Sequence, residues 1–177
     1  MKLKSITRSI DTYLAYADAK RQRWLCYANT QAICTSFKNE LLNGIHAFGV
    51  TVIRAATTVD SFKAALFLTT ATINASTTAY SATNEASGAN YTAGGVAVTN
   101  ATAPTTSGTT AFWTPSASPS WTNVTLTTAF DCVLFYNSTQ SNKAVASYTF
   151  GAQTITAGNF SLTMPVNAAG TALLQLA

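Results

Sequence analysis

The sequence predicts a mainly β protein, an antiparallel β-sandwich or jelly-roll-like domain with N-terminal helices. Short apolar runs separated by turn residues follow one another from about residue 50 to the end. Charged residues make up only 9% of the chain, and Thr, Ser, Ala, Asn and Gly take their place. No segment of 20 to 50 residues repeats, which excludes a solenoid or propeller. We expect a basic amphipathic arm or extension over residues 1–30 and a β-sandwich with a short leading helix over residues 31–177.

The N-terminal segment carries the net charge of +4. Residues 1–30 hold six Lys or Arg and two Asp, whereas residues 31–177 hold four charges of each sign. Its apolar side chains have the spacing of one helical face, at Leu3, Ile6, Ile10, Tyr13, Leu14 and Ala17. This helix is either an arm that docks on a neighbouring protein or nucleic acid, or a terminal extension with no role in the fold. The β-rich body has no charge pattern for nucleic acid.

A second, shorter helix is expected to pack on the sandwich. Thr35 and Ser36 are suited to cap its first turn, and Glu40 favours its positive end. His46, the only histidine, follows it and is interpreted as structural. The apolar stripe consists of Phe37, Leu41, Leu42 and Ile45.

Strands are predicted in order along the first part of the body. Gly94 and Gly95 indicate a bulge or tight bend before one of them. Residues 100–110, with few hydrophobes, predict a loop. The expected strands cover residues 50–53, 62–69, 96–99, 112–113 and 121–126.

Residues 130–164 are expected to organise the sandwich as two or three successive strands joined by short connections. Residues 130–136 are apolar on both faces apart from Asp131, so this strand is either central or pressed against another subunit. Residues 137–143 contain no hydrophobe and predict an exposed hairpin loop. Residues 172–176 are apolar enough for a closing strand. In the segment before them, Phe160, Leu162 and Met164 alternate with Ser161 and Thr163, which indicates one buried face.

Catalytic chemistry is sparse in this chain. No nucleophile elbow, zinc-protease motif, phosphate-binding loop or dinucleotide fingerprint occurs. We therefore predict no enzyme activity and assign no catalytic, cofactor-binding or metal residue. A hydrolase that uses Glu85 and Asp131 is the remaining catalytic hypothesis. Asp131 is expected to pair with Lys143 or Arg54, or to be exposed at the strand edge.

The three cysteines, Cys26, Cys34 and Cys132, support neither a zinc site nor a disulfide framework and are interpreted as buried thiols. We expect no signal peptide and no membrane span. Asn-x-Ser/Thr triplets are uninformative in a chain so rich in Asn and Thr; they lie at Asn74, Asn90, Asn100, Asn123, Asn137 and Asn159.

Several runs in residues 32–177 resemble a family of small structural proteins of tailed bacteriophages and prophages. The most specific are TNEASGANYTAGG and YNSTQSNKAVA, flanked in order by AICTSFKNELLNGIHAF, DSFKAALF and FGAQTITAGNFSLTMPVNAAGTALLQLA. The resemblance implies a β-sandwich virion component without catalytic residues. The first thirty residues depart from that pattern, as a docking arm or an upstream extension of the reading frame.

The leading hypothesis is a virion structural protein of the capsid decoration, neck or tail, assembled in the host bacterial cytoplasm. Its expected partners are further copies of itself and other virion proteins, with no small-molecule substrate, cofactor, nucleic acid or membrane. Low charge and the two-faced apolar strand motivate it. The alternative is a receptor- or carbohydrate-binding module of a phage fibre, suggested by Tyr80, Tyr91, Trp113 and Trp121 in or beside loops; equally, these rings belong to the core or its rim.

Overall fold

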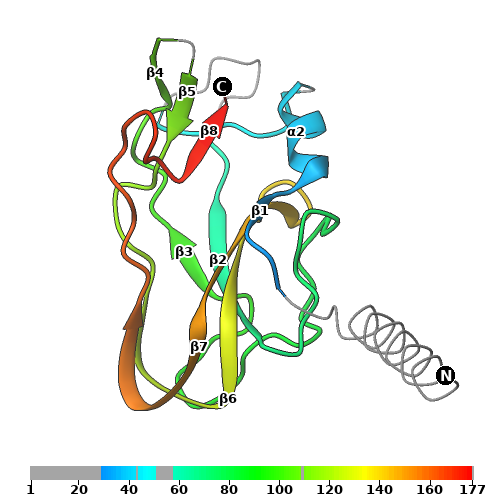
Figure 1. The fold of residues 1–177 in the computed structure, drawn as a ribbon, viewed down its shortest axis with the longest axis vertical. Coiled ribbons are helices and arrows are strands. Elements are labelled where there is room, and N and C mark those ends of the chain that lie inside the picture. Colours follow the sequence, from blue (N-terminus) through cyan, green and yellow to red (C-terminus); the bar gives the residue numbers. More distant parts are fainter. Residues whose placement is uncertain (1–28, 43, 51–57, 109, 177) are drawn as a thin grey trace, which may run out of the picture.

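The protein is mainly β, with antiparallel sheets. The structure, a computed structural model, describes residues 29–42, 44–50, 58–108 and 110–176. A five-stranded sheet has the order β1-β7-β6-β2-β3, and a three-stranded sheet has the order β4-β5-β8 (Figure 1). The elements are β1 (Ala32–Ile33), α2 (Thr35–Leu42), β2 (Phe62–Leu68), β3 (Val96–Val98), β4 (Thr105–Ser107), β5 (Thr110–Trp113), β6 (Ser120–Asn137), β7 (Lys143–Ser161) and β8 (Leu174–Leu176).

The hairpin of β6 and β7 dominates the larger sheet. The sequence predicts separate strands here, whereas each half is one continuous strand of 18 or 19 residues. Five register shifts interrupt the pairing without ending it. Because a bulge absorbs an extra residue and bends the strand, the polar interruptions are accommodated inside the ladder. We call residues 150–161, the half of β7 remote from the hairpin turn, the base of the hairpin, and this base lies at the opposite end of the molecule from the small sheet (Figure 1).

The run 130–136 is a central strand buried within its own chain. Val133, Leu134 and Phe135 are at most 3% exposed. On one side β6 pairs with β2, and on the other with β7. The strand therefore needs no second subunit to cover its two faces, which decides between the two alternatives that its composition left open.

The smaller strands depend on local backbone chemistry. Gly94 and Gly95 both have positive φ in the bend that precedes β3. A Cβ on Gly95 would lie 1.8 Å from the carbonyl oxygen of Ala64, so only glycine fits against β2. The prediction of a loop over residues 100–110 is wrong for β4, whose β-branched threonines pair with β5. The short strand β1 was also missed.

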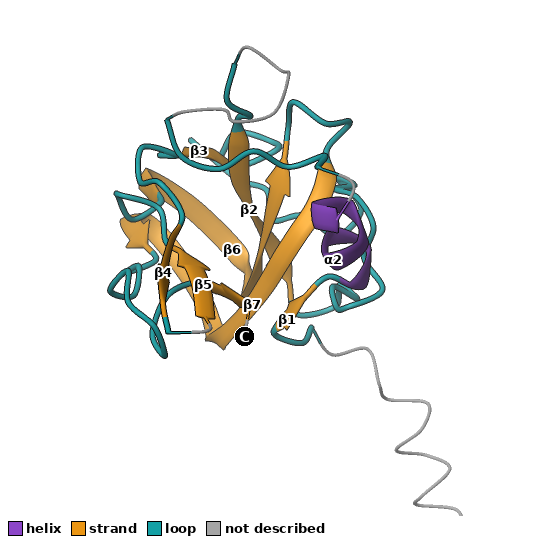
Figure 2. Cartoon of the chain, turned by 90° about the horizontal axis from the view of Figure 1, so that it is seen from above, coloured by secondary structure: helices purple, strands orange, loops and turns teal. Residues whose placement is uncertain are grey.

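One hydrophobic cluster connects the two sheets and α2. Trp113 and Leu174 of the small sheet are buried with Phe62 and Val145 of the large one. Helix α2 lies beside β7 and β1 (Figure 2) and buries Phe37, whose ring centroid is 5.9 Å from that of Phe48. The Oγ atom of Ser36 is buried without a hydrogen-bond partner among the described residues, so the predicted cap at Ser36 is wrong.

Several predictions lie outside the described residues. They concern the amphipathic segment up to residue 28, Cys26, Arg54, nearly all of the strand predicted at 50–53, and the side chains of Thr35 and Leu42. Helix α2 ends at Leu42, so Ile45, expected on its apolar stripe, follows the helix.

Candidate functional site: a buried charge network and a neutral groove

The single histidine is held inside a polar network at the tip of the β6–β7 hairpin. His46 Nε2 lies 2.8 Å from Glu40 Oε2, and Lys143 Nζ lies 2.6 Å from Glu40 Oε1. Asn137 Nδ2 lies 3.0 Å from His46 Nδ1 and 2.9 Å from Asp60 Oδ2. Glu40 is on α2, so the network ties the helix to the hairpin. The sequence indicated no partner for His46, and the structure supplies Glu40 and Asn137.

The orientation of Asn137 fixes the protonation of His46. The Oδ1 atom of Asn137 accepts hydrogen bonds from the backbone N–H groups of Thr139 and Gln140, each at 3.1 Å. Its amide nitrogen, which can only donate, therefore faces His46 Nδ1. The imidazole is neutral, and its Nε2–H donates to Glu40. Both ring nitrogens are occupied and the side chain is 0% exposed, so His46 has no free atom for a substrate or metal.

The pKa values of His46 and Glu40 are both lowered in the folded protein. Burial lowers the pKa of His46 against the opposing effect of Glu40. Burial alone would raise the pKa of Glu40, but hydrogen bonds from Lys143 and His46 bring it below its usual value. His46 is therefore neutral and Glu40 is ionised. The hydrogen bond between them anchors α2.

Glu85 is likewise used inside the chain. Its carboxylate accepts hydrogen bonds from the hydroxyls of Tyr80 and Tyr91, at 2.6 and 2.8 Å, and from the backbone N–H of Gly94 at 2.8 Å. Burial, followed by the neighbouring carboxylate, raises the pKa of Tyr136 to about 12. This cluster holds the loop of residues 80–95 against the sheet.

Asp131 does not pair with Lys143, one of its two predicted partners. Asn29 Nδ2 donates to Asp131 Oδ1 at 2.6 Å, and Lys143 is engaged with Glu40. Arg54 lies outside the described residues. Glu85 and Asp131, the two acids of the hydrolase hypothesis, thus have separate structural partners.

The tryptophans suggested as ligand contacts are buried. Trp113 is 4% and Trp121 is 2% exposed. The Nε1–H of Trp113 donates to the carbonyl of Thr102, and Trp121 packs against Phe160 at 5.7 Å between ring centroids. Tyr80 and Tyr91 are half-buried, with their hydroxyls on Glu85. All four therefore have roles in packing.

Cys34 and Cys132 are buried free thiols. Burial raises the pKa of Cys34 to about 11 and that of Cys132 to about 12, which keeps both thiols protonated and unreactive near neutral pH.

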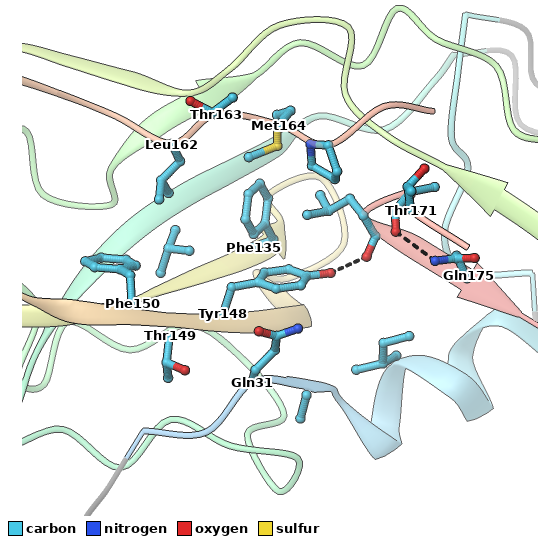
Figure 3. A pocket seen from close by; sticks show the side chains of 16 residues that line it. Gln31, Phe135, Tyr148, Thr149, Phe150, Leu162, Thr163, Met164, Thr171 and Gln175 are labelled. Atoms are coloured by element: carbon cyan, nitrogen blue, oxygen red, sulfur yellow. Dashed lines mark hydrogen bonds between the residues drawn. The ribbon is translucent and has the colours of Figure 1, made fainter. Parts of the chain in front are cut away.

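A groove of about 640 Å³ lies beside β7, and we call it the neutral groove. Its walls are β1, the middle of β7 and the chain that returns toward β8 (Figure 3). The hydroxyl of Tyr148 donates to the carbonyl oxygen of Leu173 and spans the groove floor. Among the described residues, no Lys, Arg, Asp, Glu or His lines it; Leu162, Met164 and Phe150 supply apolar surface, and Gln31 and Thr163 supply uncharged polar groups.

No protein-family model, curated protein or solved structure matches this chain. Within the described ranges, no group of three or more His, Cys, Asp or Glu side chains could hold a metal ion. No helix in the same part of the chain is long and apolar enough to cross a membrane. The site must therefore be judged on its own chemistry.

That chemistry suits contact with neutral surfaces. Residues 144–177 contain no Lys, Arg, Asp, Glu or His, and they supply most of the groove. The sequence analysis noted that charged residues are few in the whole chain, but it missed that residues 144–177 contain none. The uncharged run, visible in the sequence, is the signal that could have found the groove.

Proposed function

We propose that this chain is a bacteriophage virion structural protein, a capsid decoration, neck or tail component that assembles as a homo-oligomer through a β-sandwich. The observation that carries the proposal is where the ionisable side chains lie. His46, Glu40 and Glu85 form hydrogen bonds within the chain, whereas residues 144–177 contain no ionisable side chain other than tyrosine. A neutral surface of this kind is poorly protected against association and suits a subunit surrounded by neighbours.

Two further observations support it. Trp113 and Leu174 of the small sheet share a core with the large sheet, as the two layers of a sandwich would. The resemblance of residues 32–177 to small phage structural proteins points the same way. In this role the partners are identical copies and other virion proteins, without substrate or cofactor.

Quantitative mass spectrometry of purified particles tests the proposal. The expected result is this chain at a fixed stoichiometry to the major capsid or tail subunits of the phage that encodes it. Its absence from particles that are infectious and otherwise complete would contradict the virion role. Light scattering on the purified full chain tests the oligomer separately, and a stable monomer at micromolar concentration would contradict it.

A receptor- or carbohydrate-binding module is the second candidate. The buried tryptophans give it no support, but a second hollow of about 520 Å³ does, because hydroxyls and amides line it. Thr72, Asn74, Ser76, Thr83 and Asn84 are among its residues, and such groups match the hydrogen-bonding pattern of sugars. A glycan array without hits would remove this candidate.

A further inference from the structure

The outer edge of β7 has almost no strand beside it. On one side β7 pairs with β6 along its length, but on the other side β1 pairs only with Ala146 and Ser147. Among the described residues, no strand pairs with the outer edge over residues 149–161. An unpaired edge exposes backbone N–H and C=O groups that can accept another strand.

This edge lacks the side chains that usually prevent strand addition. Soluble proteins protect exposed edges with lysine, other charges or proline. Residues 144–164 contain none of these, and Gln153, Thr154, Thr156 and Ala157 are exposed. The neutral groove adjoins the edge, since Thr149 and Phe150 belong to both. An incoming strand would therefore meet no uncompensated charge.

The sequence of the edge is partly symmetric about Ile155: three of its five equidistant pairs are alike, whereas Gln153 differs from Ala157 and Gly151 from Asn159. Residues 150–160 are FGAQTITAGNF. Counting outward from Ile155, Thr154 matches Thr156, the small Ala152 matches Gly158, and Phe150 matches Phe160. A two-fold contact between identical strands places such equidistant residues opposite each other. Self-complementarity of this kind identifies the occupant as a second copy of this chain.

We propose that residues 150–160 of β7 pair antiparallel, about a two-fold axis at Ile155, with the same residues of a second copy. This inference rests on the homo-oligomer proposed above and names its interface. Each Phe150 lies opposite Phe160 of the other copy, and the two five-stranded sheets join into one.

Half-buried apolar side chains supply the rest of the contact. Phe150 and Phe160 lie 5.3 Å apart between ring centroids, and both pack against Phe130. Together with Ile155 they are only partly covered within one chain. One register shift lies between Gln153 and Ile155, others lie on both sides of them, and Ala157 has a positive φ, so any regular ladder here is short. Burial of the Phe150, Ile155 and Phe160 side chains must therefore contribute to the stability of the pair.

Charge-swap variants of the full chain test the interface and its register. Thr154 and Thr156 are exposed, so Thr154→Lys with Thr156→Lys leaves the monomer folded and places like charges opposite each other across the axis. Sedimentation equilibrium should show a dimer for the natural sequence and about ten- to hundredfold weaker self-association for the lysine variant. The Thr154→Glu, Thr156→Glu variant should self-associate equally weakly. An equimolar mixture of the lysine and glutamate variants should restore a dimer.

The matched control is Thr105→Lys with Ser107→Lys, which has the same spacing on the exposed edge strand β4 and should not change self-association. If the Lys and Glu variants both remain dimeric, or if their mixture gains nothing, the β7 interface is wrong while the homo-oligomer stands. A monomeric natural sequence would overturn both interface and oligomer, and particle mass spectrometry would still decide the virion role independently.

Discussion

The tip of the β6–β7 hairpin brings three ionisable side chains into contact, whereas the base of the same hairpin contains none. At the tip, Glu40 accepts hydrogen bonds from His46 and Lys143. At the base, residues 150–161 expose Thr, Ala, Gln and Asn together with half-buried Phe150 and Phe160. One hairpin thus carries two kinds of chemistry.

The difference follows from what each end must contact. The tip holds elements of its own chain, α2 and the segments around His46 and Asp60, and buried charges there need fixed partners. The base has no element of the described chain along its outer edge. Specific polar contacts therefore stabilise the tip, whereas the base keeps a neutral surface, where we propose that a neighbour binds.

The largest effect is expected from Asn137→Ala at the tip. Asn137 is 0% exposed and makes hydrogen bonds to His46, Asp60 and two backbone N–H groups. Its loss leaves buried partners unsatisfied, so the free energy of unfolding should fall by about 3 kcal/mol. Urea denaturation measures this. Ser138→Ala, which removes one exposed hydrogen bond to the Ser61 carbonyl, is the control and should cost well under half as much. Equal losses would show that the network does not stabilise the tip.

Phe160→Ala at the base should lower the free energy of unfolding by about 2 kcal/mol, less than Asn137→Ala. The Phe160 side chain packs against Trp121 and Phe130 but is only half-buried. The comparison becomes sharper when protein concentration is varied. If a second copy covers Phe160, the loss should be greater where the natural chain is dimeric than where it is dilute. The Asn137→Ala loss should not depend on concentration in this way. Equal concentration dependence of both variants would contradict the assignment of the base to an interface.

The sequence predicted the parts of the fold that depend on local pattern. The apolar run of β2, the double-glycine bend before β3 and the closing strand β8 all occur where composition indicated them. The continuity of β6 and β7 could not be predicted, because bulges admit polar interruptions that resemble turns in the sequence. Trp113 and Trp121 looked like loop residues because Pro115 and Pro119 lie beside them, although both side chains are in the core.

The polar network was beyond sequence reasoning for a different reason. Glu40 and Lys143 are 103 residues apart in the chain, and only the folded sheet brings them together. Asn137 belongs to a run without hydrophobes, which predicted an exposed loop, yet its side chain is fully buried. Polar residues gave no local indication of burial, since their partners come from α2 and from the segment before β2.

Acid should weaken the tip and spare the base. The pKa of His46 is lowered from 6.5 in the folded state, chiefly by burial, and that of Glu40 is lowered from 4.5 by its hydrogen bonds despite burial. As pH falls through about 6.5 and then about 4.5, the unfolded chain takes up these protons first, so stability falls in that window. Protection factors from hydrogen exchange, corrected for the intrinsic rate at each pH, should be lower at pH 5 than at pH 7 in α2 and residues 137–143, with those of residues 150–161 little changed. An equal loss of protection in all these segments would contradict the division between tip and base.

The smallest effect is expected from Lys143→Gln. The Lys143 side chain is 36% exposed, so its ion pair with Glu40 is partly screened and should contribute about 1 kcal/mol or less at pH 7. Because the Lys143 hydrogen bond helps to lower the pKa of Glu40, its removal should also raise the pH at which acid unfolding begins. Circular dichroism along an acid titration measures that onset. Lys63→Gln, whose Nζ lies beside Gly94 on the same sheet, is the matched control and should leave the onset unchanged. An identical onset in the two variants would mean that Lys143 contributes nothing to the ionisation of Glu40, and His46 and α2 would then hold the tip without it.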